Sequence, residues 1–196
     1  MESANLQNDS DTDEDLLIKE ACCDSAAFAQ LYRLHYDNIF RYCARRLFNH
    51  HAAEDVTSIV FFKAMRTIGS FRGNSKDFRN WLYRIATNAV NDHLRTAKRR
   101  ADAICNIAMV QGREHSFDAE SDAEFQEQVL PVKQALLTLK PKQQTVITLR
   151  FFEKLKLTEI AEILGQDPAT TRSQLSRALS SLRKKLGASV GHGREM

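Results

Sequence analysis

The sequence predicts an all-α protein made of two small helical domains joined by a flexible acidic linker. Apolar residues recur at three- and four-residue steps along most of the chain, which is the period of an amphipathic helix. No segment alternates apolar and polar residues in the manner of a half-buried strand. The 196 residues include only 7 glycines and 3 prolines, too few for an all-β protein with many turns.

Charge divides the chain into blocks and sets the predicted domain boundaries. The net charges are −6, +8, −6 and +7 for residues 1–20, 21–100, 101–131 and 132–196. Two basic blocks predict two modules that face a polyanion such as nucleic acid, although a solvated basic surface would have the same composition. We divide the chain into a disordered acidic tail (1–13), a first domain (14–100), an acidic linker (101–130), a second domain (131–187) and a tail (188–196).

The composition predicts a cytoplasmic protein that is not an enzyme and holds no metal or other cofactor. No apolar run reaches the roughly 18 residues of a membrane span, and the acidic N-terminus lacks the order of a signal peptide. The four cysteines form no C-x-x-C, and His50 and His51 have no further ligand at metal-binding spacing, so inert thiols are favoured over a metal or redox site. The basic blocks also lack the paired carboxylates of a metal-dependent or acid–base enzyme.

The first domain is predicted to begin with two amphipathic helices. The first extends to residue 47, and Asp24 or Ser25 is its predicted N-cap. The second spans roughly residues 52–67 and ends at Gly69. Its predicted buried face consists of Val56, Ile59, Val60 and the stem of Lys63.

The next segment, FRGNSKDFRNWLYRIATNAVNDHLR, combines a core face with an unusual polar face. On a helical wheel one side is apolar and has Trp81 at its border, with Phe78, Leu82, Ile85 and Ala89 as its members. The other side has cations and amides but no acid: Asn80, Arg84, Thr87, Asn88, Asn91, Arg95 and Lys98. Because Asn is a mediocre helix former, and Asn and Arg bond to bases and phosphates, we interpret this side as a nucleic-acid surface rather than a solvated face.

The loop before this helix, residues 71–77, places Phe71 beside the cations Arg72 and Lys76. An aromatic ring at the edge of a basic loop offers a stacking surface for an unpaired base, while cations follow the backbone. The loop therefore predicts single-stranded DNA as a ligand. Phe71 would equally serve as a core anchor that fixes the loop, and the two roles are compatible.

The second domain is predicted to contain short helices that end in a helix-turn-helix. The predicted helices are Val132–Leu139, Pro141–Phe152, Leu157–Leu164 and Ala169–Leu186. Gly165 supplies the turn, Asp167 caps the last helix and Pro168 is its first residue. The last helix is predicted to bury Leu175, Leu179, Leu182 and Leu186. Its polar, basic outer face suits the major groove of DNA, whereas a plain helical hairpin would explain the pattern without DNA.

Three segments, in this order, resemble the extracytoplasmic-function (ECF) sigma factors of bacterial RNA polymerase, in the sigma-70 family. AEDVTSIVFFKAM resembles the helix of conserved region two, and the segment that begins FRGNSKDF resembles the promoter-melting segment. LTEIAEILGQDPATTRSQLSRAL resembles the helix-turn-helix of region four. The resemblance implies a sigma factor, which binds core RNA polymerase, directs it to specific promoters and helps to melt the DNA.

The resemblance also implies roles for individual residues. Those implied to bind the clamp helices of the largest polymerase subunit are Glu54, Asp55, Ser58 and Phe62. Those implied to hold the opened −10 element as a single strand are Phe71, Arg72, Asn80, Trp81, Arg84, Asn88, Asn91 and Arg95. Those implied to read the −35 element as a duplex are Thr170, Arg172, Ser173, Ser176 and Arg177.

Further implied partners are the flap of core polymerase and an anti-sigma factor, without insertion into a membrane. The alternative hypothesis is a free-standing helix-turn-helix transcriptional regulator. Such a regulator would bind promoter DNA tightly by itself, whereas a sigma factor would need core polymerase.

Overall fold

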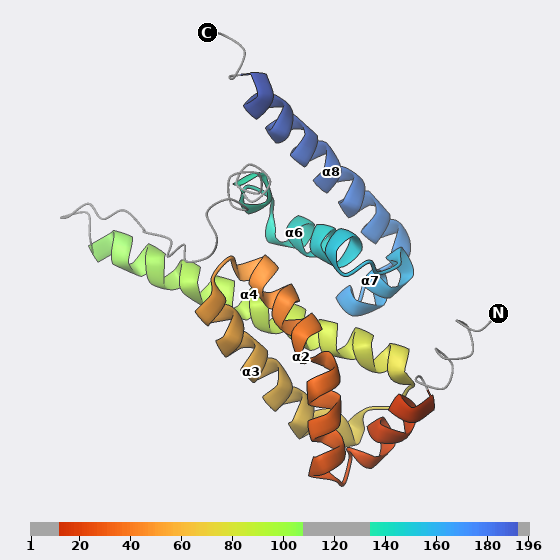
Figure 1. Ribbon diagram of the computed structural model, residues 1–196. Helices are drawn as coiled ribbons and strands as arrows, with labels where there is room; N and C mark the ends of the chain where they lie inside the picture. Colours follow the sequence, from red (N-terminus) through yellow and green to blue (C-terminus); the bar gives the residue numbers. More distant parts are fainter. Residues whose placement is uncertain (1–11, 108–133, 192–196) are drawn as a thin grey trace. The chain divides into compact units, whose positions relative to one another are not determined.

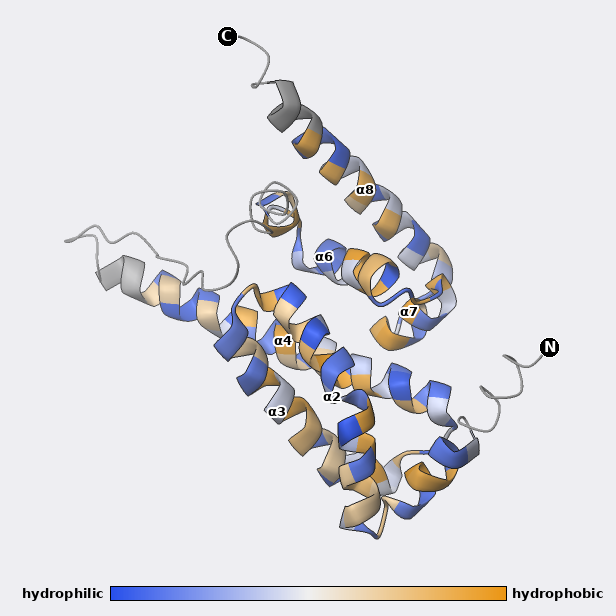
Figure 2. Ribbon diagram, viewed as in Figure 1, coloured by the Kyte–Doolittle hydropathy of each residue, from blue (hydrophilic) through white to orange (hydrophobic). Residues whose placement is uncertain are grey.

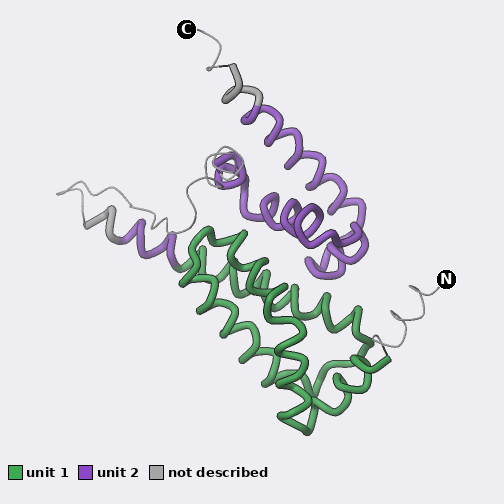
Figure 3. Tube along the Cα trace, in the orientation of Figure 1, with its two compact units in different colours: residues 1–96 green, residues 97–196 purple. Residues whose placement is uncertain are grey.

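The computed structural model describes residues 12–107 and 134–191, and regular structure in these ranges is entirely helical (Figure 1). The predicted all-α fold class is confirmed for this part of the chain. The chain divides into two compact units, Met1–Thr96 and Ala97–Met196, coloured separately in Figure 3.

Helices α2 (Ser25–Leu47) and α3 (His50–Thr67) form an antiparallel pair in the first unit (Figure 1). Asp24 is the N-cap of α2, because its Oδ1 accepts a hydrogen bond of 2.8 Å from the amide of Ala26. Asn49 caps α3 in the same way through the amide of Ala52, also at 2.8 Å. The cap at Asp24 was predicted, whereas the cap at Asn49 starts α3 two residues earlier than predicted.

The buried seam of α3 differs from the predicted one. Ile59 is 46% exposed and Lys63 is exposed, although both were assigned to the core. Val56 and Val60, which were also assigned to the core, are buried as predicted, and the buried stripe of α3 is completed by Ala53, Thr57, Phe61 and Ala64. Beyond its polar first turns this helix is largely apolar (Figure 2), and because it has apolar residues on two sides, the sequence period alone does not indicate which side is covered.

Helix α4 (Ser75–Ile107) begins in the first unit, to which its residues up to Thr96 belong. Its buried residues include Phe78, Leu82 and Val90, which are at most 1% exposed. The first domain was predicted to end at residue 100, but the helix continues through 107, so the first seven residues of the predicted linker are helical. The rest of that linker lies outside the described residues.

The N-terminal boundary was also misplaced. Residues 12–20 form a helix, which we call the N-terminal helix, and residues 12 and 13 had been assigned to the disordered tail. Ile18 is 3% exposed and Ala21, just after the helix, is 6% exposed, so this segment is part of the core. The remainder of the predicted N-terminal tail, residues 1–11, lies outside the described residues.

A polar network is buried between α2 and α4. The Tyr42 hydroxyl lies 2.8 Å from Oγ1 of Thr87, and Arg46, only 2% exposed, donates from Nη2 to Oδ1 of Asn91 at 3.2 Å. Burial raises the pKa of the Tyr42 phenol above its ordinary value, although the charge of Arg46 and the bond to Thr87 oppose the shift. The phenol is therefore held neutral in the folded state.

Tyr42→Phe should cost about 1 kcal/mol of unfolding free energy at neutral pH, because a buried hydrogen bond is lost. Folded wild-type protein keeps the phenolic proton at pH values where the unfolded chain loses it, so this contribution is present below about pH 10 and is lost as pH rises. The difference between wild type and Tyr42→Phe should therefore shrink above that pH. Denaturant unfolding from pH 7 to 11 measures this stability difference. Tyr32→Phe, on the exposed side of α2, is the control. A stability difference that stays constant over this pH range would contradict the buried network.

The second unit contains α6 (Pro141–Ile147), the π-helical turn η2 (Thr148–Phe152), α7 (Leu157–Leu164) and α8 (Pro168–Gly191). The predicted helix over residues 132–139 is helical at residues 134–137 and then turns, while residues 132 and 133 lie outside the described residues. The core of the second unit includes Val146, Leu149, Ile160, Ala161, Ile163 and Ala178. The predicted tail, residues 188–196, begins inside α8, and residues 192–196 are not described.

The turn between α7 and α8 follows the sequence prediction closely. Gly165 adopts a left-handed conformation with φ 61°, which glycine tolerates and which ends α7. Oδ2 of Asp167 accepts hydrogen bonds from the amides of Ala169 at 2.7 Å and Thr170 at 3.3 Å, so Asp167 caps α8.

The buried side of α8 was predicted only in part. The four leucines assigned to the core, Leu175, Leu179, Leu182 and Leu186, are half-buried, whereas Thr171 and Ala178 are completely buried. Small side chains at the contact allow α8 to approach its neighbours closely, and the leucines lie along the edges of that contact.

Candidate nucleic-acid interface

The Phe71 loop, residues 71–74, connects the 3₁₀ turn η1 (Ile68–Ser70) to α4. The amide of Phe71 donates to the carbonyl of Ile68 at 2.9 Å. The Arg72 guanidinium folds back on the turn and donates to the carbonyls of Gly69 at 2.9 Å and Phe71 at 2.6 Å. The loop is therefore an ordered turn with its own hydrogen bonds.

Gly73 is required by the shape of this loop. Its φ is +152°, and a Cβ at this position would lie 2.7 Å from Cβ of Asp77 and 3.1 Å from Cζ of Phe71. Both distances are shorter than normal contacts, so a side chain would displace Asp77 or the Phe71 ring.

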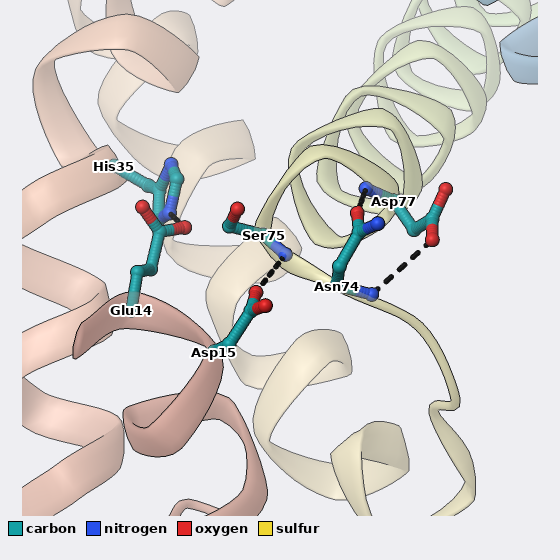
Figure 4. Close-up of polar contacts among 6 residues, drawn as sticks. All are labelled: Glu14, Asp15, His35, Asn74, Ser75 and Asp77. Atoms are coloured by element: carbon teal, nitrogen blue, oxygen red, sulfur yellow. Dashed lines mark hydrogen bonds and ion pairs between the residues drawn. The ribbon is translucent and has the colours of Figure 1, made fainter. Parts of the chain in front are cut away.

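The loop ends in a reciprocal cap at the start of α4. Oδ1 of Asn74 accepts from the amide of Asp77 at 3.0 Å, and Oδ2 of Asp77 accepts from the amide of Asn74 at 3.2 Å (Figure 4). This arrangement is a capping box, which fixes the direction in which the chain enters the helix. An acid at this position also interacts favourably with the positive end of the helix.

Three aromatic rings support the loop from one side. The ring centroids of Phe71 and Trp81 are 5.2 Å apart, and each lies 5.5 Å from that of Phe78. Phe78 is 1% exposed, whereas Phe71 and Trp81 are half-buried. The ring of Phe71 is anchored on Phe78 and still offers part of its surface, so its position is compatible with both roles considered for it. Partly exposed aromatic rings beside cations can stack an unpaired base.

The polar side of α4 is narrower than the helical wheel predicted. Arg84, Asn88, Asn91 and Arg95 are exposed, as expected. Asn80, however, is only 6% exposed, and its assignment to a DNA-facing surface is wrong in this structure. Thr87 is likewise buried, at 4% exposed, against Tyr42. Asn80 and Thr87 are seven residues apart and share one face of the helix, and that face packs against the protein.

The outer face of α3 is an exposed apolar stripe. Ile59, Phe62 and Met65 are 46%, 55% and 50% exposed, and the Arg66 guanidinium lies 5.8 Å from the Phe62 ring centroid. The remaining residues predicted for polymerase binding on this helix are all exposed, and they are Glu54, Asp55 and Ser58. Sequence reasoning assigned Ile59 to the core, although the three-residue spacing from 59 to 62 to 65 was an available signal for one shared stripe.

The start of α3 brings together three side chains that sequence reasoning kept apart. Nδ1 of His50 and Nδ1 of His51 lie 3.6 Å and 3.7 Å from the carboxylate oxygens of Glu54. The expectation that the two histidines have no neighbour at ligand spacing was therefore wrong, because three- and four-residue steps meet on a helix. Two imidazoles and a carboxylate are ligands that suit a divalent transition metal, and the three ligand atoms lie within 4.8 Å of one another, but all three side chains are exposed.

The residues predicted to read duplex DNA all lie on the exposed side of α8. They are Thr170, Arg172, Ser173, Ser176 and Arg177. Arg172 and Arg177 are the cations of this group, and the N-terminal end of α8 follows the tight turn at Gly165. The arrangement is a helix-turn-helix whose second helix is available to enter a groove.

Within the described residues no helix is long and apolar enough to cross a membrane.

Comparison with known families matches Sigma-70 region 2 over residues 31–100 and Sigma-70 region 4 over residues 130–182. The ECF RNA polymerase sigma factor SigW of Bacillus subtilis is 34% identical over 170 residues, which cover 83% of this chain and 90% of SigW. The RNA polymerase sigma-H factor of Pseudomonas aeruginosa is 32% identical over 181 residues, covering 89% and 93% of the two chains.

Two solved structures share the fold at low sequence identity. The sigma factor RpoE from Bartonella quintana, in complex with the anti-sigma factor NepR, is 22% identical with a TM-score of 0.65, over 82% of this chain and 96% of RpoE. CnrH, in complex with the cytosolic domain of CnrY, has the same identity and TM-score over 89% and 97% of the two chains. The two matched regions overlap the predicted first and second domains and follow the same order along the sequence. The chain belongs to the ECF sigma factors of the sigma-70 family, the subunits that direct RNA polymerase to promoters.

Proposed function

We propose that this sigma factor uses three separate surfaces: the outer face of α3 for core polymerase, the Phe71 loop with α4 for the opened −10 element, and α8 for the −35 duplex. The observation that carries the proposal is the ring pair of Phe71 and Trp81, half-exposed over buried Phe78 and followed on α4 by exposed Arg84 and Asn88. A helix that only closed a core would have no need of this combination.

The loop and α4 favour melted DNA because their contacts are available only to a separated strand. Stacking of one unpaired base on an aromatic ring contributes about 1–3 kcal/mol. Arg84, Asn88, Asn91 and Arg95 continue the surface along the helix, and Arg72 lies in the loop. A surface that binds only the opened state shifts the equilibrium towards that state. Because Asn80 is buried, we assign it to the fold of the first unit rather than to DNA.

The stripe on α3 has the composition of a protein interface. Ile59, Phe62 and Met65 form an apolar centre, and Glu54 and Asp55 supply charge beside it. Interfaces commonly combine an apolar centre with a polar rim. We assign this face to the clamp helices of the largest polymerase subunit.

The second unit offers one surface to DNA and one to protein. Polar and basic side chains on α8 would read the −35 element in the major groove, at about 1–3 kcal/mol for each good base contact, and phosphate contacts would weaken with salt. Leu137, Phe151 and Phe152 are 42%, 53% and 40% exposed. We assign this apolar group to the flap of core polymerase.

An anti-sigma partner is part of the proposal. RpoE, which shares this fold, was solved with the anti-sigma factor NepR. The exposed apolar side chains of both units are suitable for such a partner, which would then exclude polymerase. Polymerase is a cytoplasmic enzyme, so we place this protein in the cytoplasm.

The test is run-off transcription on genomic fragments with core polymerase. We expect discrete transcripts only when this protein and core polymerase are both present, with weak DNA binding by the protein alone. Tight promoter binding without polymerase, and no transcript with it, would instead establish a free-standing helix-turn-helix regulator.

Asn88→Ala should lower open-complex formation about tenfold while binding to the −35 duplex is kept, because Asn88 is exposed on α4 and contacts only the separated strand. Permanganate reactivity of unpaired thymines measures opening, and gel-shift titration of the upstream duplex with holoenzyme measures binding. Arg177→Ala is the complementary variant, since it should weaken the upstream contact first. Equal losses of opening and of duplex binding in Asn88→Ala would place Asn88 in a structural role.

A further inference from the structure

The N-terminal helix, residues 12–20, and the residues just after it contact the two elements that flank the Phe71 loop, namely η1 and α4. Oδ1 of Asp15 accepts from the amide of Ser75 at 2.5 Å (Figure 4). Sγ of Cys22, just after the helix, lies 3.6 Å from the carbonyl of Ile68, at the other end of the loop. Both ends of the segment from η1 to α4 are therefore held by one short N-terminal segment.

The contact at Ser75 satisfies a group that the helix itself leaves without an acceptor. Asn74 caps α4, so Ser75 is its first residue, and the first amides of a helix have no intrahelical partner. A carboxylate at this end is also favoured by the helix dipole. Asp15 thus accepts a hydrogen bond from a backbone amide at the start of α4 from 60 residues away, as the side chains of Asn74 and Asp77 do locally.

A second line of contacts leads from the N-terminal helix to the aromatic rings. Oε1 of Glu14 lies 3.0 Å from Nε2 of His35, and both side chains are mostly buried. The His35 ring lies edge-on to Phe78, with 5.3 Å between centroids. Phe78 in turn supports Phe71 and Trp81. Phe78, which supports the two rings assigned to base stacking, therefore also contacts His35, and Glu14 holds His35 in place.

We propose that the N-terminal helix holds the Phe71 loop in the shape that accepts an unpaired base, with Asp15 and Glu14 as its positioning residues. The role rests on the proposed function of the loop, which it deepens. The acidic residues of this helix would repel DNA if they were free, but Asp15 and Glu14 are directed inward to Ser75 and His35 (Figure 4). Residues 12–20 thus act as a structural support (a strut) for the Phe71 loop, and the residues of the loop and of α4 make the contacts to DNA.

The test begins with the full-length protein alone, because Trp81 is the only tryptophan in the chain and lies in the ring cluster. Asp15→Ala should raise hydrogen exchange at the Ser75 amide about tenfold, since a charge-assisted bond is removed. Glu14→Ala should change the Trp81 emission and its quenching by acrylamide. Asp15→Asn should restore much of the protection, because its amide oxygen can still accept from Ser75. Asp13→Ala, at an exposed acid of the same helix, is the matched control and should change neither signal.

The second part uses holoenzyme on a promoter identified by run-off transcription. Asp15→Ala and Glu14→Ala should lower open-complex formation about three- to tenfold, with −35 duplex binding and polymerase binding unchanged. Unchanged exchange and fluorescence would overturn the inference, as would a disturbed loop that opens DNA normally. More open complex in either variant would mean that the helix competes with DNA, and would also overturn it. If wild-type holoenzyme starts no transcript, the proposed function fails instead, and the free-protein signals still test the strut.

Discussion

Phe62→Asp should abolish binding of this sigma factor to core polymerase, raising the dissociation constant by about 100-fold or more. Phe62 is 55% exposed at the middle of the apolar stripe on α3, so the fold does not depend on its burial. In an interface the new carboxylate would be transferred from water to an apolar surface without an assigned partner, which is costly. Titration of dye-labelled protein with core polymerase measures the change, and circular dichroism checks the helical content.

Leu34→Asp is the matched control for this experiment. Leu34 is also 55% exposed, but it lies on α2. The two variants therefore make the same kind of change at the same exposure, and Leu34→Asp should bind polymerase as wild type does. If both variants bind normally, the stripe on α3 is not the polymerase surface; if both lose binding, the loss is not specific to α3.

Phe78→Ala should destabilise the first unit by about 3–5 kcal/mol, the usual cost of deleting a buried phenylalanine ring. Phe78 is 1% exposed and contacts the rings of His35, Phe71 and Trp81, so its removal leaves a cavity at the centre of the loop support. Trp81 fluorescence during denaturant unfolding reports on this unit, because the tryptophan lies at that cavity. Open-complex formation should fall together with stability.

The second unit supplies an internal reference. Hydrogen exchange of the α7 and α8 amides should be unchanged in Phe78→Ala, because these helices belong to a separate compact unit. Phe151→Ala, at a phenylalanine that is 53% exposed, should cost less than about 1 kcal/mol. Equal destabilisation of both units by Phe78→Ala would show that the chain unfolds as one cooperative block.

Local signals in the sequence predicted much of the fold. Asp24, Gly165 and Asp167 were identified as caps and turn, and each has the predicted role, because such signals depend on the backbone of only a few neighbouring residues. The helical period likewise predicted the helices, with boundaries that differ by a few residues. The end of α4 is an exception, since no local signal marks a stop near residue 100.

The faces of the helices were harder to predict, because a face is defined by its neighbours. Asn80 and Thr87 looked like part of a polar surface, yet Thr87 meets Tyr42 from another helix and is buried. Ile59 looked like core but is exposed, because Val56 and Val60 already fill the contact. The buried hydroxyl of Thr87 is matched by a partner that lies 45 residues away in the sequence, and a helical wheel contains no such partner.

The N-terminal helix was missed for a related reason. Its acidic composition is typical of a disordered tail, and only a short run of apolar residues, Leu16, Leu17 and Ile18, indicated otherwise. The helix is stable because it is packed on the first unit, where Ile18 is buried, Asp15 accepts from the amide of Ser75, and Glu14 is paired with His35. Short helices gain most of their stability from such packing.

Gly73 has a consequence for how promoter preference changes among descendants of this sequence. No other residue fits at position 73 without displacing Asp77 or Phe71, so the backbone of the loop is inherited nearly unchanged. Arg72 and Lys76 are both exposed, but Arg72 also donates to the carbonyls of Gly69 and Phe71, whereas Lys76 lies in the first turn of α4. In the proposed role, base preference can therefore change through exposed substitutions in the first turn of α4 while Gly73 keeps the loop backbone, and specificity can diverge faster than structure.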